Sequence, residues 1–329
     1  MKILVTGSSG LIAAPLCYEL MQNGHHVIGI DNYINSSTDN TQTLISSFSE
    51  NFNFYEFDIS SDYTKLNTVF KNHRPDTVIH LAALKSVQES MLKAEKYWKN
   101  NINSTINILN SMKDMDCNQI IYSSSAAVYG NQEFQPVKEN VRLKPVSVYG
   151  ETKVECEALI AKASMENNIK AISLRYFNPV GIHSSNLFHD AITNDKGSIM
   201  QEIIKSALDK NTVLEIFGNT YPTKDGTCER DFIHIEDLID AHIKSMNFIE
   251  NNLGHHVFNV GTGNAISILE LLKAFIKYNK IPIDYIFTNK KYGDIHRSYA
   301  DVSDIKRRLN WQSKKSLKHM VEDSWKQYL

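Results

Sequence analysis

The sequence has few of the features that mark zinc-bound, disulfide-bonded or membrane-anchored proteins. Its 329 residues include four cysteines without any C-x-x-C spacing, which excludes a zinc ribbon and makes a disulfide framework a poor explanation. The histidines show no metal-ligand spacing either, so we expect no metal. No apolar run approaches the roughly 18 residues of a membrane-spanning helix. The first run, residues 3–5, ends at Thr6 and Gly7, too early for a signal peptide. We therefore expect a cytoplasmic protein that does not bind membranes.

The chain also lacks an excess of charge of either sign. It carries 35 Lys and Arg against 37 Asp and Glu, a net charge of −2, and the two signs are mixed along its length. A basic stretch or a strongly basic total is typical of proteins that bind nucleic acids or anionic lipids without specificity. The balance argues against nucleic acid as a partner.

What the sequence does contain is a regular alternation of apolar strands and helical periods. Strand patterns rich in Ile, Val, Phe and Tyr cover residues 2–6, 26–31, 52–59, 77–82, 119–123 and 171–178. Helical periods cover residues 11–22, 63–73, 94–112 and 146–167. This pattern predicts an α/β fold, a Rossmann-type doubly wound parallel sheet with helices on both faces. We expect residues 1–178 to form this domain and residues 179–329 to form a smaller α/β domain. The boundary is approximate and allows the two to interleave.

A glycine-rich turn follows the first strand and opens the first helix. Gly7 permits a tight turn and Gly10 a close approach of the backbone to a pyrophosphate at the helix N-terminus. Ala13 is small enough for the helix to pack against the strand. Asp31 ends the second strand, where a carboxylate accepts hydrogen bonds from a ribose 2′-OH and repels a 2′-phosphate. The pattern therefore predicts that the cofactor is NAD. A tight turn followed by a capping Asp is the alternative.

A second group of residues has the chemistry of proton transfer. Tyr149 and Lys153 lie four residues apart at a predicted helix start, so they share one face. A tyrosine is a weak base at pH 7, and a nearby ammonium group favours its phenolate. Ser125 ends a triplet of serines at the carboxyl edge of the sheet, where its hydroxyl can bind a substrate oxygen. An ordinary helix face and a polar turn are the alternatives for these residues.

Taken together, these motifs resemble the extended short-chain dehydrogenase/reductase superfamily. The resemblance rests on Gly7 and Gly10, on Asp31 and Asn32, and on the segments 123–130 and 149–153. The second half of the chain resembles one family within this superfamily, the UDP-glucose/UDP-galactose 4-epimerases. That closer resemblance rests on residues 175–181, 216–227 and 230–238. The resemblance covers residues 3 to about 301.

The resemblance implies an isomerase that interconverts UDP-glucose and UDP-galactose through a transient 4-keto sugar. Tyr149 would take the proton of the sugar 4-OH while the C4 hydride passes to NAD. Lys153 would hold the nicotinamide ribose and lower the tyrosine pKa, and Ser125 would bind the 4-oxygen. The first domain would hold NAD, and the second mainly the UDP-sugar.

The resemblance also implies contact residues for both ligands. Further NAD contacts would come from Leu11, Ile12, Asn32, Asn35, Ser36, Asp58, Ile59, Leu81, Ala82, Ala83, Lys85, Asn100 and Phe177. The UDP-sugar would meet Asn178, Ser198, Ile199, Glu215, Ile216, Phe217, Arg230, Lys291, Asp294 and Ser298, besides Ser125 and Tyr149. Arg230 is also a candidate on physical grounds, because a guanidinium can donate two parallel hydrogen bonds to phosphate oxygens. An ion pair of Arg230 with Asp231 or Glu229 is its alternative role.

Ser298 resembles a size gate beside the sugar 2-substituent in this family. A small residue there implies that UDP-N-acetylglucosamine and UDP-N-acetylgalactosamine are also substrates. Several positions depart from the family: Ala13 and Ala14 follow the glycine turn, Ala127 replaces a Thr, Lys291 replaces an Arg, and Gly197-Ser198 replaces an Asn pair.

Two other functions stay open at this point. A nucleotide-sugar 4,6-dehydratase or decarboxylase of the same superfamily is one, although Ala126 and Ala127 occupy the slot in which dehydratases carry carboxyl groups. A non-catalytic NAD-sensing protein is the other, but it would need neither Tyr149 nor Lys153. The resemblance further implies a homodimer through helices 94–112 and 146–167.

Overall fold

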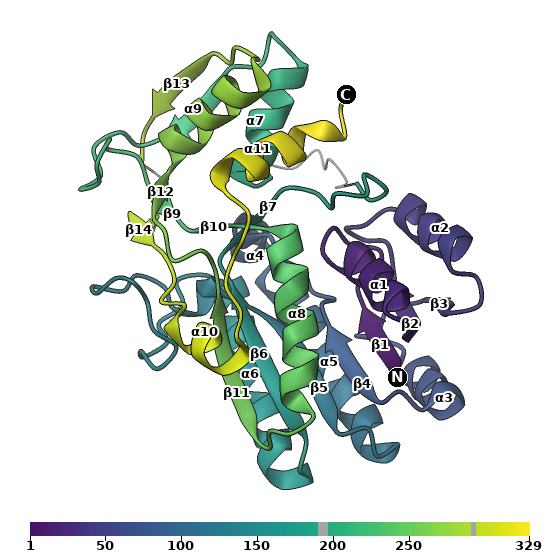
Figure 1. Ribbon diagram of the computed structural model, residues 1–329. Helices are drawn as coiled ribbons and strands as arrows, with labels where there is room; N and C mark the ends of the chain where they lie inside the picture. The colour runs from purple at the N-terminus through teal and green to yellow at the C-terminus, as the bar shows by residue number, and fades with distance from the viewer. Residues whose placement is uncertain (190–196, 291–293) are drawn as a thin grey trace.

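The structure, a computed structural model, describes residues 1–189, 197–290 and 294–329. Its centre is a seven-stranded sheet in the order β11-β6-β5-β4-β1-β2-β3 (Figure 1), in which all neighbouring strands are parallel. The strand order reverses at β1, because the chain builds outward from it first through β2 and then through β4. This arrangement is a Rossmann-type doubly wound sheet, and the predicted fold class is confirmed.

The elements of this part largely follow the predicted pattern. The strands are β1 (Lys2–Thr6), β2 (His26–Asp31), β3 (Phe52–Glu56), β4 (Thr77–His80), β5 (Gln119–Ser125), β6 (Lys170–Tyr176) and β11 (His255–Val260). The helices are α1 (Ala13–Gln22), α2 (Thr38–Ser47), α3 (Tyr63–His73), α4 (Val87–Leu92), α5 (Ala94–Asp114), α6 (Val148–Asn167), α8 (Ile235–Ile249) and the 3-10 turn η1 (Ala126–Val128). The sequence pattern did not predict α4, and it placed the start of α1 two residues too early.

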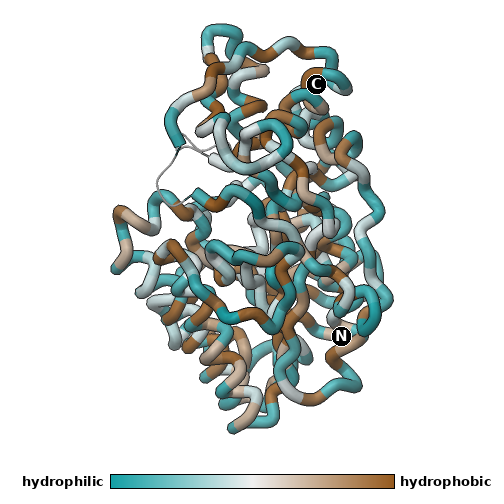
Figure 2. Tube along the Cα trace, turned by 90° about the vertical axis from the view of Figure 1, so that its left-hand side faces the viewer, coloured by the Kyte–Doolittle hydropathy of each residue, from teal (hydrophilic) through white to brown (hydrophobic). Residues whose placement is uncertain are grey.

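Alternate residues of the strands supply the cores on the two faces of the sheet. Ile3 and Val5 of β1 face a cluster that includes α1 and α8, whereas Leu4 faces a cluster with α3, α5 and α6. All three side chains are fully buried. Hydrophobic stretches lie inside the lower part of the molecule, and its outer turns are hydrophilic (Figure 2). Burial on both faces explains why the strands are continuously apolar.

A smaller lobe is built on helices α7 (Ile199–Leu208), α9 (Ile268–Asn279) and α11 (Leu317–Lys326) around the pair β8 (Leu214–Phe217) and β13 (Tyr285–Thr288). It lies above the sheet in Figure 1. Short strands lie between the two parts: β7 (Asn178–Val180) with β10 (Phe232–His234), and β9 (Glu229–Arg230) with β12 (Ile266–Ser267) and β14 (Arg297–Ser298). Helix α10 (Ser303–Leu309) packs on β11.

The predicted strand over residues 171–178 is two strands in the structure. Phe177 N–H donates to Val260 O at 3.1 Å and keeps the end of β6 against β11. The next residue, Asn178, donates its N–H to Asp231 O at 2.9 Å and so begins β7, paired with β10. The chain therefore passes at Phe177 from the large sheet into the short strands below the smaller lobe.

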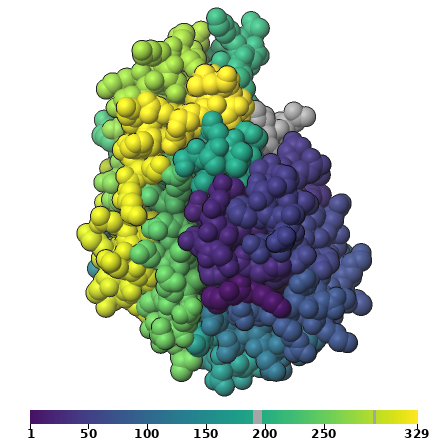
Figure 3. Space-filling view, turned by 45° about the vertical axis from the view of Figure 1, so that its right-hand side comes forward, coloured from purple at the N-terminus to yellow at the C-terminus, as the bar shows by residue number. Residues whose placement is uncertain are grey.

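The second half of the chain returns to the large sheet. Strand β11 pairs with β6 along its full length, from His255 beside Ala171 to Val260 beside Tyr176. The C-terminal segment then runs beside α8 (Figure 3), where Trp311 donates its indole N–H to Asp237 O at 3.1 Å. Residues on both sides of position 178 thus share one sheet. None of the helices in the described residues is long and apolar enough to cross a membrane.

Candidate active site

The glycine turn after β1 has the shape that a dinucleotide needs. Gly7 has a φ of +70°, and a Cβ at this position would lie 2.9 Å from Ala82 N, so only glycine fits against the segment after β4. Gly10 N–H donates to Gly7 O at 3.0 Å and closes the turn in front of α1. The turn lies at the carboxyl end of β1, between β2 and β4, which is the position where doubly wound sheets bind nucleotides.

Asp31 completes this turn from the end of β2. Its carboxylate accepts hydrogen bonds from Ser9 N–H at 2.9 Å, from Tyr33 N–H at 2.9 Å and from Ser36 Oγ at 2.8 Å. The side chain is almost fully buried. The negative charge is therefore held at the outer edge of the turn, where it repels a 2′-phosphate. These residues fit NAD.

The other residues expected to contact NAD come from the carboxyl ends of neighbouring strands. Leu11 and Ile12 follow β1, Asn32 and Asn35 follow β2, Asp58 and Ile59 follow β3, Leu81, Ala82, Ala83 and Lys85 follow β4, Asn100 lies in α5, and Phe177 lies between β6 and β7. Ala82 N–H donates to Thr6 Oγ1 at 3.1 Å, which ends β4 earlier than the sequence predicted. The fold thus brings residues from five strands to one edge.

Tyr149 and Ser125 meet because helix α6 begins close against η1. Ser147 caps α6 by accepting from Gly150 N–H at 3.1 Å, and a Cβ on Gly150 would lie only 2.6 Å from Ala127 O. Burial of this region raises the pKa of Tyr149 to about 12, and a hydrogen bond from Ser125 opposes that rise. Tyr149 therefore needs positive charge near it to act as a base.

Lys153 lies one helical turn further along α6. Its Nζ donates to Ser123 O at 2.7 Å and lies 5.8 Å from the centre of the Tyr149 ring. Burial lowers the pKa of Lys153 to about 8, while the nearby Cys156 and Glu157 oppose this decrease. The ammonium group therefore remains largely protonated at pH 7. The expected effect of Lys153 on the pKa of Tyr149 stays a prediction.

A cavity of about 270 Å³ is lined mainly by residues of the smaller lobe and of β9, with Gln88 of α4 contributed by the sheet part of the molecule. Of the predicted residues, Ile199, Glu215, Ile216, Phe217, Arg230 and Asp294 line it. Asn178, Ser198 and Ser298 lie outside the lining, at the start of β7, at the N-cap of α7 and in β14. Lys291 lies outside the described residues. The sequence did not point to the remaining lining residues, which carry no motif of their own; they include Gln88, Glu202, Ser206, Thr212, Val213, Leu214, Cys228 and Ile268.

Arg230 is held in the cavity by a carboxylate. Its Nη2 donates to Asp294 Oδ1 at 2.8 Å and its Nη1 to Glu229 O at 3.0 Å. The ion-pair partner is thus neither Asp231 nor the Glu229 carboxylate, which were the alternatives from sequence. Asp294 also accepts a hydrogen bond from Tyr221 Oη at 3.4 Å. The Arg230 side chain is 19% exposed and lines the cavity, where a guanidinium can bind an anion.

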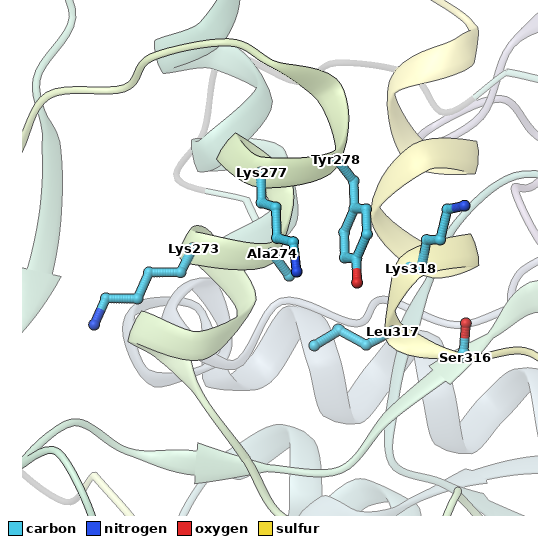
Figure 4. Close-up of a pocket in the computed structure, with 7 residues that line it drawn as sticks. All are labelled: Lys273, Ala274, Lys277, Tyr278, Ser316, Leu317 and Lys318. Atoms are coloured by element: carbon cyan, nitrogen blue, oxygen red, sulfur yellow. The ribbon is translucent and has the colours of Figure 1, made fainter.

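A second depression lies on the surface of the smaller lobe, between α9 and α11 (Figure 4). Tyr278 points across it towards Leu317, and Lys277 and Lys318 lie on either side, with Nζ atoms 5.1 and 5.8 Å from the ring centre. It shares no residue with the expected site. Among the described residues, no group of three or more His, Cys, Asp or Glu side chains could hold a metal ion.

Comparison with known proteins gives this geometry its context. Residues 3–261 match the NAD dependent epimerase/dehydratase family. UDP-glucose 4-epimerase of Bacillus subtilis is 36% identical over 327 residues, covering 99% of this chain and 96% of the relative. The chain belongs to the NAD-dependent epimerase/dehydratase family.

Solved structures of epimerases have the same fold throughout. UDP-glucose 4-epimerase from Stenotrophomonas maltophila, with bound NAD and formylated UDP-arabinopyranose, superposes with a TM-score of 0.95 at 35% identity, covering 99% of this chain and 97% of that one. The UDP-Glc/GlcNAc 4-epimerase of Campylobacter jejuni superposes with a TM-score of 0.87 at 30% identity, covering 99% and 98%. As a member of this epimerase/dehydratase family, the chain uses NAD, and the predicted cofactor is confirmed.

Proposed function

We propose that the protein is a UDP-glucose 4-epimerase that also converts UDP-N-acetylglucosamine to UDP-N-acetylgalactosamine. The observation that supports this proposal best is that Tyr149 and Lys153 of α6 contact Ser125 and Ser123 at the carboxyl end of β5. The similarity to the UDP-glucose 4-epimerases of Bacillus subtilis and Stenotrophomonas maltophila supports it.

The residues of this chain divide the work between two ligands. When bound, NAD⁺ would supply hydride transfer from and back to C4 of the sugar. The glycine turn and Asp31 hold the dinucleotide, and Lys153 holds its ribose. Tyr149 accepts the proton of the sugar 4-OH and returns it to the same oxygen when C4 is reduced again, and Ser125 orients that oxygen. Arg230 binds the diphosphate, so that the sugar ring alone turns within the site.

Conversion of UDP-galactose to UDP-glucose by the purified protein tests this proposal. Product is measured with a coupled UDP-glucose dehydrogenase. A 4-keto-6-deoxy product would instead support the dehydratase, although the slot for its carboxyl groups holds Ala126 and Ala127 in η1. Bound NAD without turnover of any common UDP-hexose would support an NAD-sensing protein.

The small side chain of Ser298 is expected to admit an N-acetyl group. Ser298 lies in β14 beside Arg230 of β9, and its carbonyl oxygen accepts from Asp231 N–H at 3.1 Å, so its backbone is fixed. We expect Ser298→Tyr to lower kcat/KM for UDP-N-acetylgalactosamine by about 100-fold, because the ring fills the space for the substituent. Turnover of UDP-galactose should change by less than about threefold. Equal losses on both substrates, or no wild-type activity with UDP-N-acetylglucosamine, would contradict this role.

We further propose that the protein is a homodimer through α5 and α6. Trp98, Ile102 and Ile106 recur every four residues on α5, and Trp98 and Ile106 are 38% and 36% exposed. An apolar stripe on a long helix favours packing against another helix. Light scattering should give a molar mass twice that of one chain, and Ile106→Glu should lower the measured mass to that of the monomer. A monomeric wild type would refute the proposal.

A further inference from the structure

A buried ion pair lies behind the proposed catalytic residues. Arg175 of β6 donates from Nε and Nη2 to the two carboxylate oxygens of Glu157 in α6, at 2.9 and 2.6 Å. The two side chains are only 5% and 6% exposed. Taking two charges out of water is costly, and stability alone is a poor reason for such a pair. Neither residue belongs to the expected NAD or substrate contacts.

The pair fixes the end of β5 on α6. Ser124 donates from its hydroxyl to Glu157 Oε1 at 2.5 Å. One residue earlier, Ser123 O accepts from Lys153 Nζ at 2.7 Å. Tyr149, Lys153 and Glu157 follow one another at four-residue spacing on one face of α6. Consecutive residues of β5 are therefore bound by consecutive turns of the helix, and the next residue of the strand is Ser125.

The same arginine reaches the opposite side of the site. Its Nη1 donates to Tyr129 Oη at 3.0 Å and to Glu139 O at 2.9 Å. Tyr129 in turn donates to Asn259 Oδ1 of β11 at 2.5 Å. The Asn259 amide donates to Val137 O at 2.8 Å and to Asp301 O at 3.1 Å. We call Ser124, Tyr129, Glu157, Arg175 and Asn259 the Glu157 network; it joins α6 to three strands and to the segment after Ser298.

We propose that Glu157 and Arg175 are positioning residues for the epimerisation, because they hold α6 on β5 so that Tyr149 and Lys153 face Ser125. This role rests on the proposed function. The network acts on the elements that carry the reacting groups, β5 and α6. The cavity that would bind UDP is lined instead by residues of β8, β9 and α7. Loss of the network should therefore reduce kcat and leave KM nearly unchanged.

The charge of Glu157 has a second effect on the site. Burial lowers the pKa of Lys153 to about 8, and the Glu157 carboxylate is one of the groups that oppose this decrease. It therefore helps Lys153 to remain an ammonium group beside Tyr149. Arg175 satisfies both carboxylate oxygens, so Glu157 keeps a fixed orientation while it does so.

The first test compares Glu157→Gln with a matched core variant of the same helix, Ile160→Ala. Glu157→Gln should lower kcat for UDP-galactose by about 100-fold, the effect expected when reacting groups move by about 1 Å. Its KM and the Kd of UDP should stay within about threefold, because the cavity is unchanged. Ile160 is fully buried one turn from the network, and Ile160→Ala should lower Tm while kcat at a temperature well below Tm is retained. Identical kinetics for the two variants would overturn the proposal.

The double variant Glu157→Leu/Arg175→Met separates positioning from stability. Replacing a buried pair by apolar side chains often restores stability, so Tm should return towards the wild-type value. We expect kcat to remain low, because Ser124 has lost its acceptor on α6 and Tyr129 has lost the guanidinium that donates to it. Recovery of both Tm and kcat would show a purely structural pair and overturn the proposal.

If the double variant does not fold, Ser124→Ala tests the positioning role instead, because it keeps the charges of both Glu157 and Arg175. We expect its kcat to fall about tenfold at constant KM, and a wild-type kcat would overturn the proposal. Turnover of UDP-galactose by the wild type in the same assay shows that the epimerase function holds, so a wild-type kcat in Ser124→Ala then contradicts the positioning role alone. A wild type without turnover refutes that function and the positioning role with it.

Discussion

Tyr149→Phe is expected to lower kcat for UDP-galactose by about 10²- to 10⁴-fold, the contribution of a positioned general acid–base group. The phenylalanine ring keeps the packing of α6 against η1 but has no hydroxyl to exchange a proton with the sugar 4-OH. Because Arg230 and Asp31 are untouched, binding of UDP and NAD should remain near the wild-type values. The measurement is the coupled assay of UDP-galactose turnover, with the Kd of UDP determined by calorimetry.

Tyr278→Phe provides the control for Tyr149→Phe. Tyr278 lies in the surface depression between α9 and α11, away from the proposed site, so loss of its hydroxyl should leave kcat unchanged. A kcat of Tyr149→Phe within tenfold of wild type would contradict the role of Tyr149. Loss of UDP binding in that variant would instead show that the substitution disturbs the cavity.

Arg230→Met is expected to raise KM for UDP-galactose by about 30- to 160-fold, which corresponds to the loss of about 2–3 kcal/mol of charged hydrogen bonds. The guanidinium lies in the cavity with Asp294 Oδ1 at 2.8 Å. Its removal takes a positive charge away from the diphosphate and leaves the Asp294 carboxylate beside it. The reacting groups on β5 and α6 are unchanged, so kcat should fall by much less than KM rises.

Two further variants sharpen the Arg230 experiment. Arg230→Met/Asp294→Asn removes the unpaired carboxylate as well and should recover part of the lost affinity for UDP. Arg307→Met removes a surface arginine of α10 that pairs with Asp304, and it should behave as wild type. An unchanged KM in Arg230→Met would place the diphosphate elsewhere and contradict the proposed use of the cavity.

The elements of the fold that sequence could predict are those encoded locally. The glycine turn, the strand ending at Asp31 and the four-residue spacing of Tyr149 and Lys153 each depend on neighbouring residues. Strand β11 could not be placed in this way, because its pairing with β6 joins residues about 80 positions apart, and periodicity does not encode the partner of a strand.

The same distinction applies to the site. The carboxyl edge of a doubly wound sheet collects residues whose strands can be recognised one at a time, so Ser125 and Asp31 could be assigned from sequence. A positioning role for Glu157 could not be predicted, because in the sequence Glu157 is one of many charged residues on helices. Only the fold shows that Arg175 of β6 contacts it. Likewise, the sequence could not show that Arg230 pairs with Asp294 rather than with Asp231 or Glu229, because Asp294 lies 64 positions along the chain.

The most direct test of the epimerase assignment is the conversion of UDP-galactose by the wild-type protein in D₂O, followed by proton NMR. A hydride that leaves C4 and returns to it does not exchange with solvent, so we expect UDP-glucose with its C4 hydrogen retained. Tyr149→Phe under the same conditions should leave UDP-galactose essentially unchanged. Deuterium at C4, a 4-keto-6-deoxy product or no conversion by the wild type would contradict the account.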